Sequence, residues 1–436
     1  MMAPMDSTNT PTVYALDFGT SNSLLAAANA ERVFPPVPID PTAPDPTVLR
    51  SVLYFPNAKR CYYGHEALTR YADSGLEGRL LRSIKRHLPA RSFLGTYIDD
   101  RPMLVEDLVA ALLREARVRA DTYFGTEVTR VVLGRPARFC DDPGDDAFAE
   151  RRLLQAAKKA GFEDVTFLPE PVAAAREFGA EVGEKRTVLV ADFGGGTSDF
   201  TVMRVEKGRF ANSDVLAIGG VALAGDALDA SIMRHQVARN FGAEVTYKAP
   251  FGSNVLTMPK AIVEQLCSPA HLSMLRRQDV AEFLRNVRKW SLGPNDREKL
   301  DQLNVLVDDA QGFQLFEVIE RAKRDLSRAA ESEVVFEYPS IDVHEKVSRE
   351  AFESGSRRET DTILRCLDET VSAAGITPSE VDLVCCTGGT ARVRRLATEI
   401  RARFGEDKVR DWKSFHSVVE GLALHARALA ADAIQA

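Results

Sequence analysis

The sequence predicts an α/β protein made of two related lobes, and three observations support this. The chain has 436 residues, which is too long for one compact core. Apolar runs typical of buried strands alternate with helical segments, as in α/β folds. An apolar strand ending in Asp-Phe-Gly occurs twice, with its aspartates at 17 and 192, 175 residues apart. That spacing is too long for a solenoid repeat and indicates a duplicated domain whose halves face each other.

The strand and helix patterns divide the chain into two lobes. Residues 1–12 are expected to be disordered. Lobe I is predicted at 13–185 with an inserted subdomain at about 50–120, and lobe II at 186–436 with one at about 242–315. Strands are predicted at 13–18, 53–55, 61–63, 128–133, 187–193, 201–205, 334–338 and 381–386. Helices are predicted at 66–85, with a break near Gly75 and Gly78, and at 105–123, 150–161, 226–241, 313–330, 349–374 and 417–431.

The composition excludes several classes of protein. The net charge of -7, from 56 basic and 63 acidic residues, argues against a dedicated nucleic-acid binder. The N-terminus lacks the basic and apolar regions of a secretory signal, and no apolar run reaches the roughly 20 residues that span a bilayer. The six cysteines form no CxxC pair, so reduced thiols are favoured over zinc or a redox pair. We expect a cytoplasmic protein without nucleic-acid or membrane partners.

The repeated motif has the chemistry of a phosphate site. Its glycines let the backbone approach a phosphate closely and expose successive N–H groups as an anion nest. Asp17 and Asp192 would repel bare phosphate, so a cation is expected between them, and Mg²⁺ fits because it is held by phosphate oxygens, carboxylates and water together. One copy alone would favour a simple hairpin turn, whereas two copies favour phosphate binding. The spacing matches neither a Walker A loop nor the Rossmann fingerprint.

These motifs resemble the nucleotide-binding domain of the DnaK heat-shock family, within the actin, hexokinase and DnaK ATPase superfamily. Residues 17–23 and 192–199 are similar to the two phosphate loops, 168–175 to the first connecting helix, and 84–86 to the segment with the catalytic lysine. Residues 320–327 look like the adenine-flanking helix, and 388–392 like the adenosine loop. The resemblance covers about residues 13–430 and is strongest to the short YegD-like members. It implies an actin-like fold of duplicated ribonuclease-H-like domains.

The resemblance also assigns roles by matched position. It implies catalytic roles for Lys85, Glu170, Asp192 and Thr197, and Mg²⁺ held mostly through water by Asp17, Glu170 and Asp192. It implies ATP or ADP binding by Asp17, Gly19, Thr20, Ser21, Asn22, Gly194, Gly195, Gly196, Thr197, Asp199, Gly225, Glu320, Lys323, Arg324, Ser327, Gly388, Gly389 and Arg392. Such residues suit phosphoryl transfer to water, where positioning and charge neutralisation supply most of the catalysis.

Some of these residues also have a simpler, structural interpretation. Lys85 could belong to a basic surface face, and Glu170, between two prolines, could be a turn residue. Glu320 and Lys323 could form an exposed helix pair worth a few tenths of a kcal/mol. His416 and Trp412 are interpreted as packing residues.

The chain also departs from the family pattern. Ala224-Gly225-Asp226 replaces two adjacent glycines, and 415–418 replace the usual Pro-Asp-Glu-Ala, which removes an acid near the adenine side. No linker, β-rich peptide-binding domain or helical lid follows in the sequence, so we expect no complete foldase cycle.

We therefore expect a monomeric, chaperone-like ATPase with slow hydrolysis, in which lobe closure is the signal. The resemblance implies unfolded polypeptides or co-chaperones as partners. Two alternatives stay open: a small-molecule kinase of the same superfamily, and a nucleotide-gated scaffold of the actin or MreB type.

Overall fold

A computed structural model describes residues 10–74, 77–140, 142–179, 185–206, 214–250, 252–268, 271–309, 311–411 and 416–435. Its internal contacts divide the chain into two compact units. The first unit comprises Met1–Gly220, Cys366–Gly388 and Arg403–Ala436, and the second comprises Val221–Arg365 and Gly389–Ala402. This division follows contacts rather than the repeat, so the lobe and insertion boundaries predicted from the sequence stay predictions. Of the segment expected to be disordered, 1–9 lie outside the described residues, whereas the Thr12 N–H donates to the Ala28 carbonyl.

The two large sheets have matching strand orders, β11-β10-β1-β2-β3 and β20-β19-β12-β13-β14. In each sheet an antiparallel hairpin, β1–β2 or β12–β13, lies beside two parallel strands. The first sheet contains β1 (Val13–Phe18), β2 (Asn22–Ala28), β3 (Val33–Phe34), β10 (Arg130–Arg135) and β11 (Asp164–Pro169), with β4 (Leu49–Arg50) also paired to β2. The second contains β12 (Arg186–Phe193), β13 (Ser198–Val205), β14 (Val215–Val221), β19 (Leu383–Thr387) and β20 (Val409–Asp411). The shared topology confirms the predicted duplication.

Two helices share one apolar core with both sheets. Helix α4 (Glu170–Gly179) packs against α13 (Ser417–Gln435), and the cluster around them includes Ala15 of β1 and Val190 of β12. Burying apolar faces from four elements at once stabilises the first unit, at roughly 25 cal/mol for each Å² removed from water. This core keeps the ends of β1 and β12 in one folded unit.

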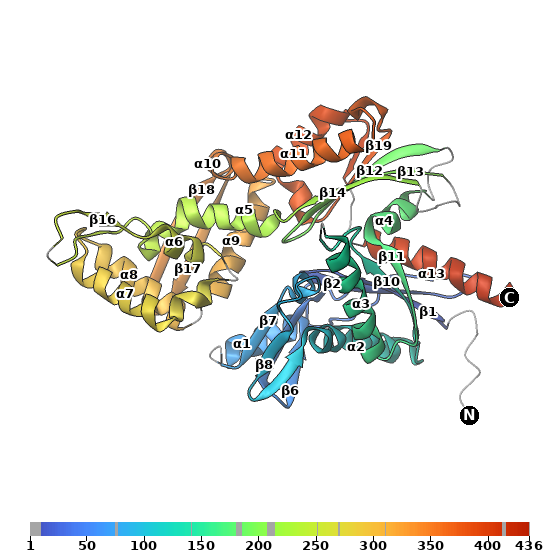
Figure 1. Cartoon of the computed structure of the whole chain (residues 1–436), viewed down its shortest axis with the longest axis horizontal. Coiled ribbons are helices and arrows are strands. Elements are labelled where there is room, and N and C mark those ends of the chain that lie inside the picture. Colours follow the sequence, from blue (N-terminus) through green and yellow to red (C-terminus); the bar gives the residue numbers. More distant parts are fainter. Residues whose placement is uncertain are drawn as a thin grey trace. The chain divides into compact units, whose positions relative to one another are not determined.

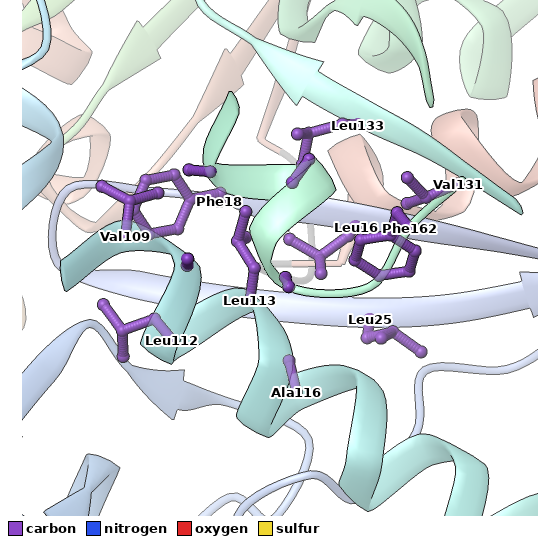
Figure 2. Close-up of a cluster of buried hydrophobic side chains, with 14 of the residues drawn as sticks. Leu16, Phe18, Leu25, Val109, Leu112, Leu113, Ala116, Val131, Leu133 and Phe162 are labelled. Carbon is purple, nitrogen blue, oxygen red and sulfur yellow. The ribbon is translucent and has the colours of Figure 1, made fainter. Parts of the chain in front are cut away.

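A second apolar cluster lies on the first sheet beside α2 (Val105–Phe124) and α3 (Pro143–Lys159). Figure 2 shows Leu16 and Phe18 of β1 near Val109 and Leu113 of α2. The helix predicted at 105–123 is confirmed, and the one predicted at 150–161 begins earlier, at Pro143, behind the N-cap Asp142. The sheet is thus covered by helices, as expected for an α/β fold.

The helix predicted at 66–85 is confirmed before its predicted break and wrong after it. Among the described residues, α1 (Gly64–Asp73) is followed by β7 (Arg79–Arg82) and a 3-10 turn, η2 (Ile84–His87). Gly78 has φ +88°, which cannot continue a helix, and β7 pairs with β5 (Val52–Asn57), itself paired with β6 (Arg60–Tyr63). Tertiary pairing therefore overrides the helical pattern here. A hairpin of β8 (Gly95–Ile98) and β9 (Arg101–Leu104) follows.

The second unit is mainly helical, and its helices α7 and α8 lie side by side (Figure 1). The helix predicted at 226–241 is α5 (Gly225–Ile232) followed by a π-helical and a 3-10 turn, and the one predicted at 349–374 is divided at Ser356. The remaining elements are β15 (Thr246–Tyr247), β16 (Leu256–Thr257), α6 (Lys260–Leu266), α7 (Gln278–Trp290), α8 (Asp296–Asp308), α9 (Gly312–Leu326), β17 (Glu331–Tyr338), β18 (Ile341–Ser348) and α10 (Arg349–Gly355). Helices α11 (Arg357–Ala373) and α12 (Arg394–Phe404) run from this unit into the first.

The structure describes all six cysteines and joins none of them in a disulfide; three are buried and three are partly buried. The reduced state of the thiols stays a prediction. None of the helices in the described part of the chain combines the length and hydropathy needed to cross a bilayer.

Candidate functional site

The two predicted phosphate loops share one backbone hydrogen bond. The Gly19 N–H donates to the Asn22 carbonyl at 3.0 Å, and the Gly194 N–H donates to the Thr197 carbonyl at 2.9 Å. A β-carbon on Gly19 would lie 2.3 Å from the Asn22 carbonyl oxygen, so the first turn requires glycine. Both turns therefore present their backbone at the end of a buried strand, as a phosphate loop requires.

A residue that the sequence analysis missed supports the first loop. The Ser51 hydroxyl donates to the Gly19 carbonyl at 2.8 Å, and its backbone N–H donates to the Ser21 carbonyl at 2.9 Å. Ser51 also hydrogen-bonds the hydroxyl of buried Ser23 at 2.9 Å. Ser51 lies outside the repeated motif, so no local sequence signal marks it. Thr20 and Asn22 are partly exposed and Ser21 is exposed, so their side chains are available to a ligand.

Three predicted carboxylates lie at the ends of the hairpin strands and have raised pKa values. Burial, with repulsion from Glu170, raises the pKa of Asp17 to about 8. Burial, with repulsion from Asp192, raises the pKa of Asp199 to about 7, since these two residues face each other across β12 and β13. Burial also raises the pKa of Asp192. The ligand-free site therefore disfavours the ionised form of these carboxyl groups, and a bound cation would offset that cost.

Lys85 is the buried cation of this site. Its Nζ lies 2.7 Å from Oε1 of Glu170, the first residue of α4, and the two side chains are 9% and 13% exposed. Burial lowers the Lys85 pKa, but the charges of Glu170 and Asp17 outweigh burial and raise it overall. Interpreting Lys85 as a surface residue is therefore wrong, and Glu170 is an ion-pair partner rather than only a turn residue.

The second loop is held by two threonines. The Thr197 hydroxyl donates to Asp199 at 2.9 Å, and the Thr387 hydroxyl, at the end of β19, donates to Asp192 at 2.6 Å. The sequence analysis missed Thr387, although it directly precedes the predicted adenosine loop. Gly388 has φ +82°, and a β-carbon there would lie 2.1 Å from the Phe193 carbonyl oxygen, so this position requires glycine. Gly194 is exposed, Gly195 is partly exposed and Gly196 is buried.

The predicted adenosine residues, Gly388 apart, belong to the second unit. Helix α9 carries Glu320, Lys323 and Arg324, with Ser327 directly after it, and Gly389 and Arg392 lie in a 3-10 turn. The ammonium of Lys323 donates to Asp229 at 2.8 Å and to the Gly225 carbonyl at 3.1 Å. Lys323 is buried, so the interpretation as an exposed pair is wrong for this residue. Asp229, on α5, was not predicted.

The chain departs from the family pattern at 224–226 and 415–418, and the structure describes residues of both segments. Ala224 precedes α5, with Gly225 as its first residue. His416 Nε2 hydrogen-bonds the Thr47 hydroxyl at 2.9 Å, in agreement with a packing role. Trp412 and Phe415 lie outside the described residues.

The carboxylates of the first unit suit a hard divalent cation. Mg²⁺ prefers oxygen ligands such as carboxylates, and a bound cation would lower the raised pKa values of these carboxyl groups. Among the described residues, ligand atoms that all lie within 4.8 Å of one another occur in exposed Glu337, Asp342 and His344, not in Asp17, Glu170 and Asp192.

Comparisons with known proteins point to one family. A model of the Hsp70 protein family matches residues 86–249 and 295–435, more than half of the chain. The chaperone protein DnaK of Thermosipho africanus is 24% identical over 428 residues, 96% of this chain and 59% of that protein. A chaperone protein HscA homolog of Rickettsia prowazekii is 27% identical over 280 residues, 58% of this chain and 45% of that protein. The chain thus spans about half the length of these relatives.

The family match and the two sheets with the same strand order support the same conclusion. The chain belongs to the Hsp70 protein family and has its actin-like ATPase fold.

Proposed function

We propose that the chain binds ATP with Mg²⁺ at the two loops and slowly hydrolyses it to ADP and phosphate, as a chaperone-type ATPase. One observation carries the proposal: buried Lys85, paired with Glu170, interacts electrostatically with the aspartates that end β1 and β12. A buried cation beside carboxylates whose pKa values are displaced is typical of a functional site. Members of the Hsp70 family bind ATP or ADP with Mg²⁺, which makes this ligand the first to test.

The residues of the first unit would position the reacting groups. Backbone N–H groups of Thr20 and Gly195 would cradle the phosphates, and the Lys85 ammonium would contact the terminal phosphate and orient the attacking water. The water oxygen bonds to the terminal phosphorus while the bond from that phosphorus to the bridging oxygen breaks, and the water proton leaves to solvent or phosphate. Asp17, Glu170 and Asp192 would hold Mg²⁺ mostly through water, and the ion would neutralise phosphate charge.

The second unit would hold the nucleoside. Glu320, Arg324 and Ser327 lie on or beside one helix, α9, with Lys323 tied to Gly225. We propose that this set, with Gly388, Gly389 and Arg392, contacts adenine and ribose. One predicted phosphate loop belongs to lobe I (13–185) and the other to lobe II (186–436), so a nucleotide bound by both loops would couple the lobes, and lobe closure would be the signal. Polypeptide or co-chaperone partners and a monomeric state belong to this proposal.

The first experiment measures binding of Mg·ATP by calorimetry and hydrolysis in a single turnover. Lys85→Ala is expected to retain binding and lose hydrolysis by about 100-fold or more, since positioned charge supplies most of the catalysis. Lys59→Ala, which removes an exposed lysine of the same unit, is the matched control and should change neither value. Asp192→Ala is expected to weaken Mg²⁺-dependent binding.

Three other results would change the conclusion. Full affinity and turnover in Asp192→Ala would show that the site is assigned wrongly. Tight binding without turnover in the unmodified protein would favour a nucleotide-gated scaffold. No nucleotide binding at all would refute the proposed function.

A further inference from the structure

The turn that carries Lys85 carries a second cation, Arg86, in different surroundings. Lys85 is buried against Glu170, whereas Arg86 is exposed. The Arg86 side chain forms no hydrogen bond or ion pair with any residue that the structure describes, and only its backbone N–H is engaged, by the Ser83 carbonyl. Its guanidinium donors are therefore available to a ligand.

The Arg86 side chain lies against the second phosphate loop. A β-carbon built on Gly196 would lie 3.7 Å from Cζ and Nε of Arg86 and 3.8 Å from its Cδ. These are van der Waals distances, so the guanidinium is packed beside the last of the loop's three glycines. Both residues belong to the first unit. The position therefore follows from the packing within one folded unit.

The charge of the site calls for a second cation. Lys85 already shares its charge with Glu170 at 2.7 Å, and the carboxyl groups of Asp192 and Asp199 face each other at the ends of β12 and β13 in the same unit. A terminal phosphate would add about two more charges at neutral pH. Even with Mg²⁺ present, one lysine shared with a carboxylate leaves the phosphate oxygens undercompensated.

We propose that Arg86 donates its free N–H groups to the terminal phosphate of the nucleotide, so that it discriminates triphosphate from diphosphate. A guanidinium has two parallel donors that match phosphate oxygens, which an ammonium lacks. Its charge would also stabilise the negative charge on the transferred phosphoryl group, as a cationic arginine does in other phosphoryl-transfer enzymes. This inference rests on the proposed function.

The test compares Arg86→Ala and Arg86→Lys with the full chain, using ADP and a non-hydrolysable ATP analogue in calorimetry and single-turnover hydrolysis of ATP. Arg60→Ala, which removes an exposed arginine on β6, is the matched control. Arg86→Ala should lower the hydrolysis rate and the affinity for the analogue by at least ten-fold, with ADP affinity within about two-fold. For Arg86→Lys we expect a hydrolysis rate and an analogue affinity between those of Arg86→Ala and the unmodified protein. Added guanidinium ions should restore part of the rate in Arg86→Ala and not in Lys85→Ala.

Three results would overturn the inference. If Arg86→Ala binds nucleotide and keeps the hydrolysis rate and the analogue affinity unchanged, the proposed role of Arg86 is refuted, and the proposed function still stands. Equal losses of ADP and analogue affinity, without rescue by guanidinium, would show a structural role. If the unmodified protein binds neither nucleotide, both the inference and the proposed function fail. Arg86→Lys keeps the charge and the packing, so it stays informative if Arg86→Ala folds poorly.

Discussion

A β-carbon on Gly421 would lie 1.8 Å from the carbonyl oxygen of Ala173, so α13 and α4 cross with their backbones in direct contact. This crossing lies in the core shared by the two large sheets. Glu170, the partner of Lys85, begins the same α4, so the position of the ion pair depends on how closely the two helices pack.

Gly421→Ala is expected to lower the free energy of unfolding by about 1–3 kcal/mol, because the added methyl group must push α4 and α13 apart. In an exposed helix the same change would stabilise by about 1 kcal/mol, so the sign of the effect is diagnostic. Urea unfolding measures it, with Ala428→Ser on the exposed side of α13 as the control. A stabilised Gly421→Ala protein would contradict the helix crossing.

The pH dependence of the ligand-free protein should reveal Asp17. Burial raises its folded pKa to about 8, so the stability it contributes is present below pH 4 and is lost as the pH rises to about 8. Asp17→Asn should therefore make the ligand-free protein more stable at pH 8, by about 1 kcal/mol or more, since each pKa unit corresponds to about 1.4 kcal/mol. Thermal unfolding at pH 5.5 and 8 measures the difference. Asp100→Asn, at an exposed position, serves as the control, and equal curves for Asp17→Asn and the unmodified protein would refute this account.

His425 on α13 should make the protein sensitive to acid. Burial, with repulsion from Arg176, lowers its pKa to about 4, and its Nδ1 has no hydrogen-bond partner among the described residues. In the unfolded chain His425 takes up a proton near pH 6.5, whereas in the folded protein it stays neutral down to about pH 4. The free energy of unfolding therefore falls as the pH drops from about 6.5 to about 4. We expect a loss of about 1–2 kcal/mol between pH 7 and 5 from this residue.

His425→Gln should remove that part of the pH dependence in urea unfolding at pH 7 and 5. His271→Gln, at an exposed histidine, should leave it in place. If His425→Gln loses as much stability at pH 5 as the unmodified protein, the histidine is not the cause.

The ion pair of Asp229 and Lys323 ties α5 to α9. Asp229→Ala should cost about 3–5 kcal/mol, because it leaves a buried ammonium unpaired, whereas Asp229→Leu combined with Lys323→Met should cost much less. A double-mutant cycle in urea unfolding separates the pair energy from packing. Additive losses from the two single changes would show that the pair is not coupled. Nucleotide affinity, measured in parallel, tests the adenosine role of Lys323 separately from its structural one.

Sequence reasoning succeeded where the signal is local. Strands β1 and β12 both end in Asp-Phe, and the N–H of the following glycine donates to the carbonyl of the residue three positions further along. At Gly19 a close contact also requires glycine. The prediction failed after the break in the helix at 66–85, where residues expected to be helical form β7 and pair with β5. Thr387 was missed because its contact with Asp192 joins residues 195 positions apart.

The sequence by itself determined the duplicated architecture and the positions of both glycine turns, because strand periodicity and glycine turns are encoded in a few consecutive residues. Only the tertiary structure decided which member of Lys85-Arg86 faces Glu170 and which lies beside Gly196. The tertiary structure also decided that the pKa values of Asp17, Asp192 and Asp199 are raised, because burial and the distances between charges depend on chain segments far apart in the sequence.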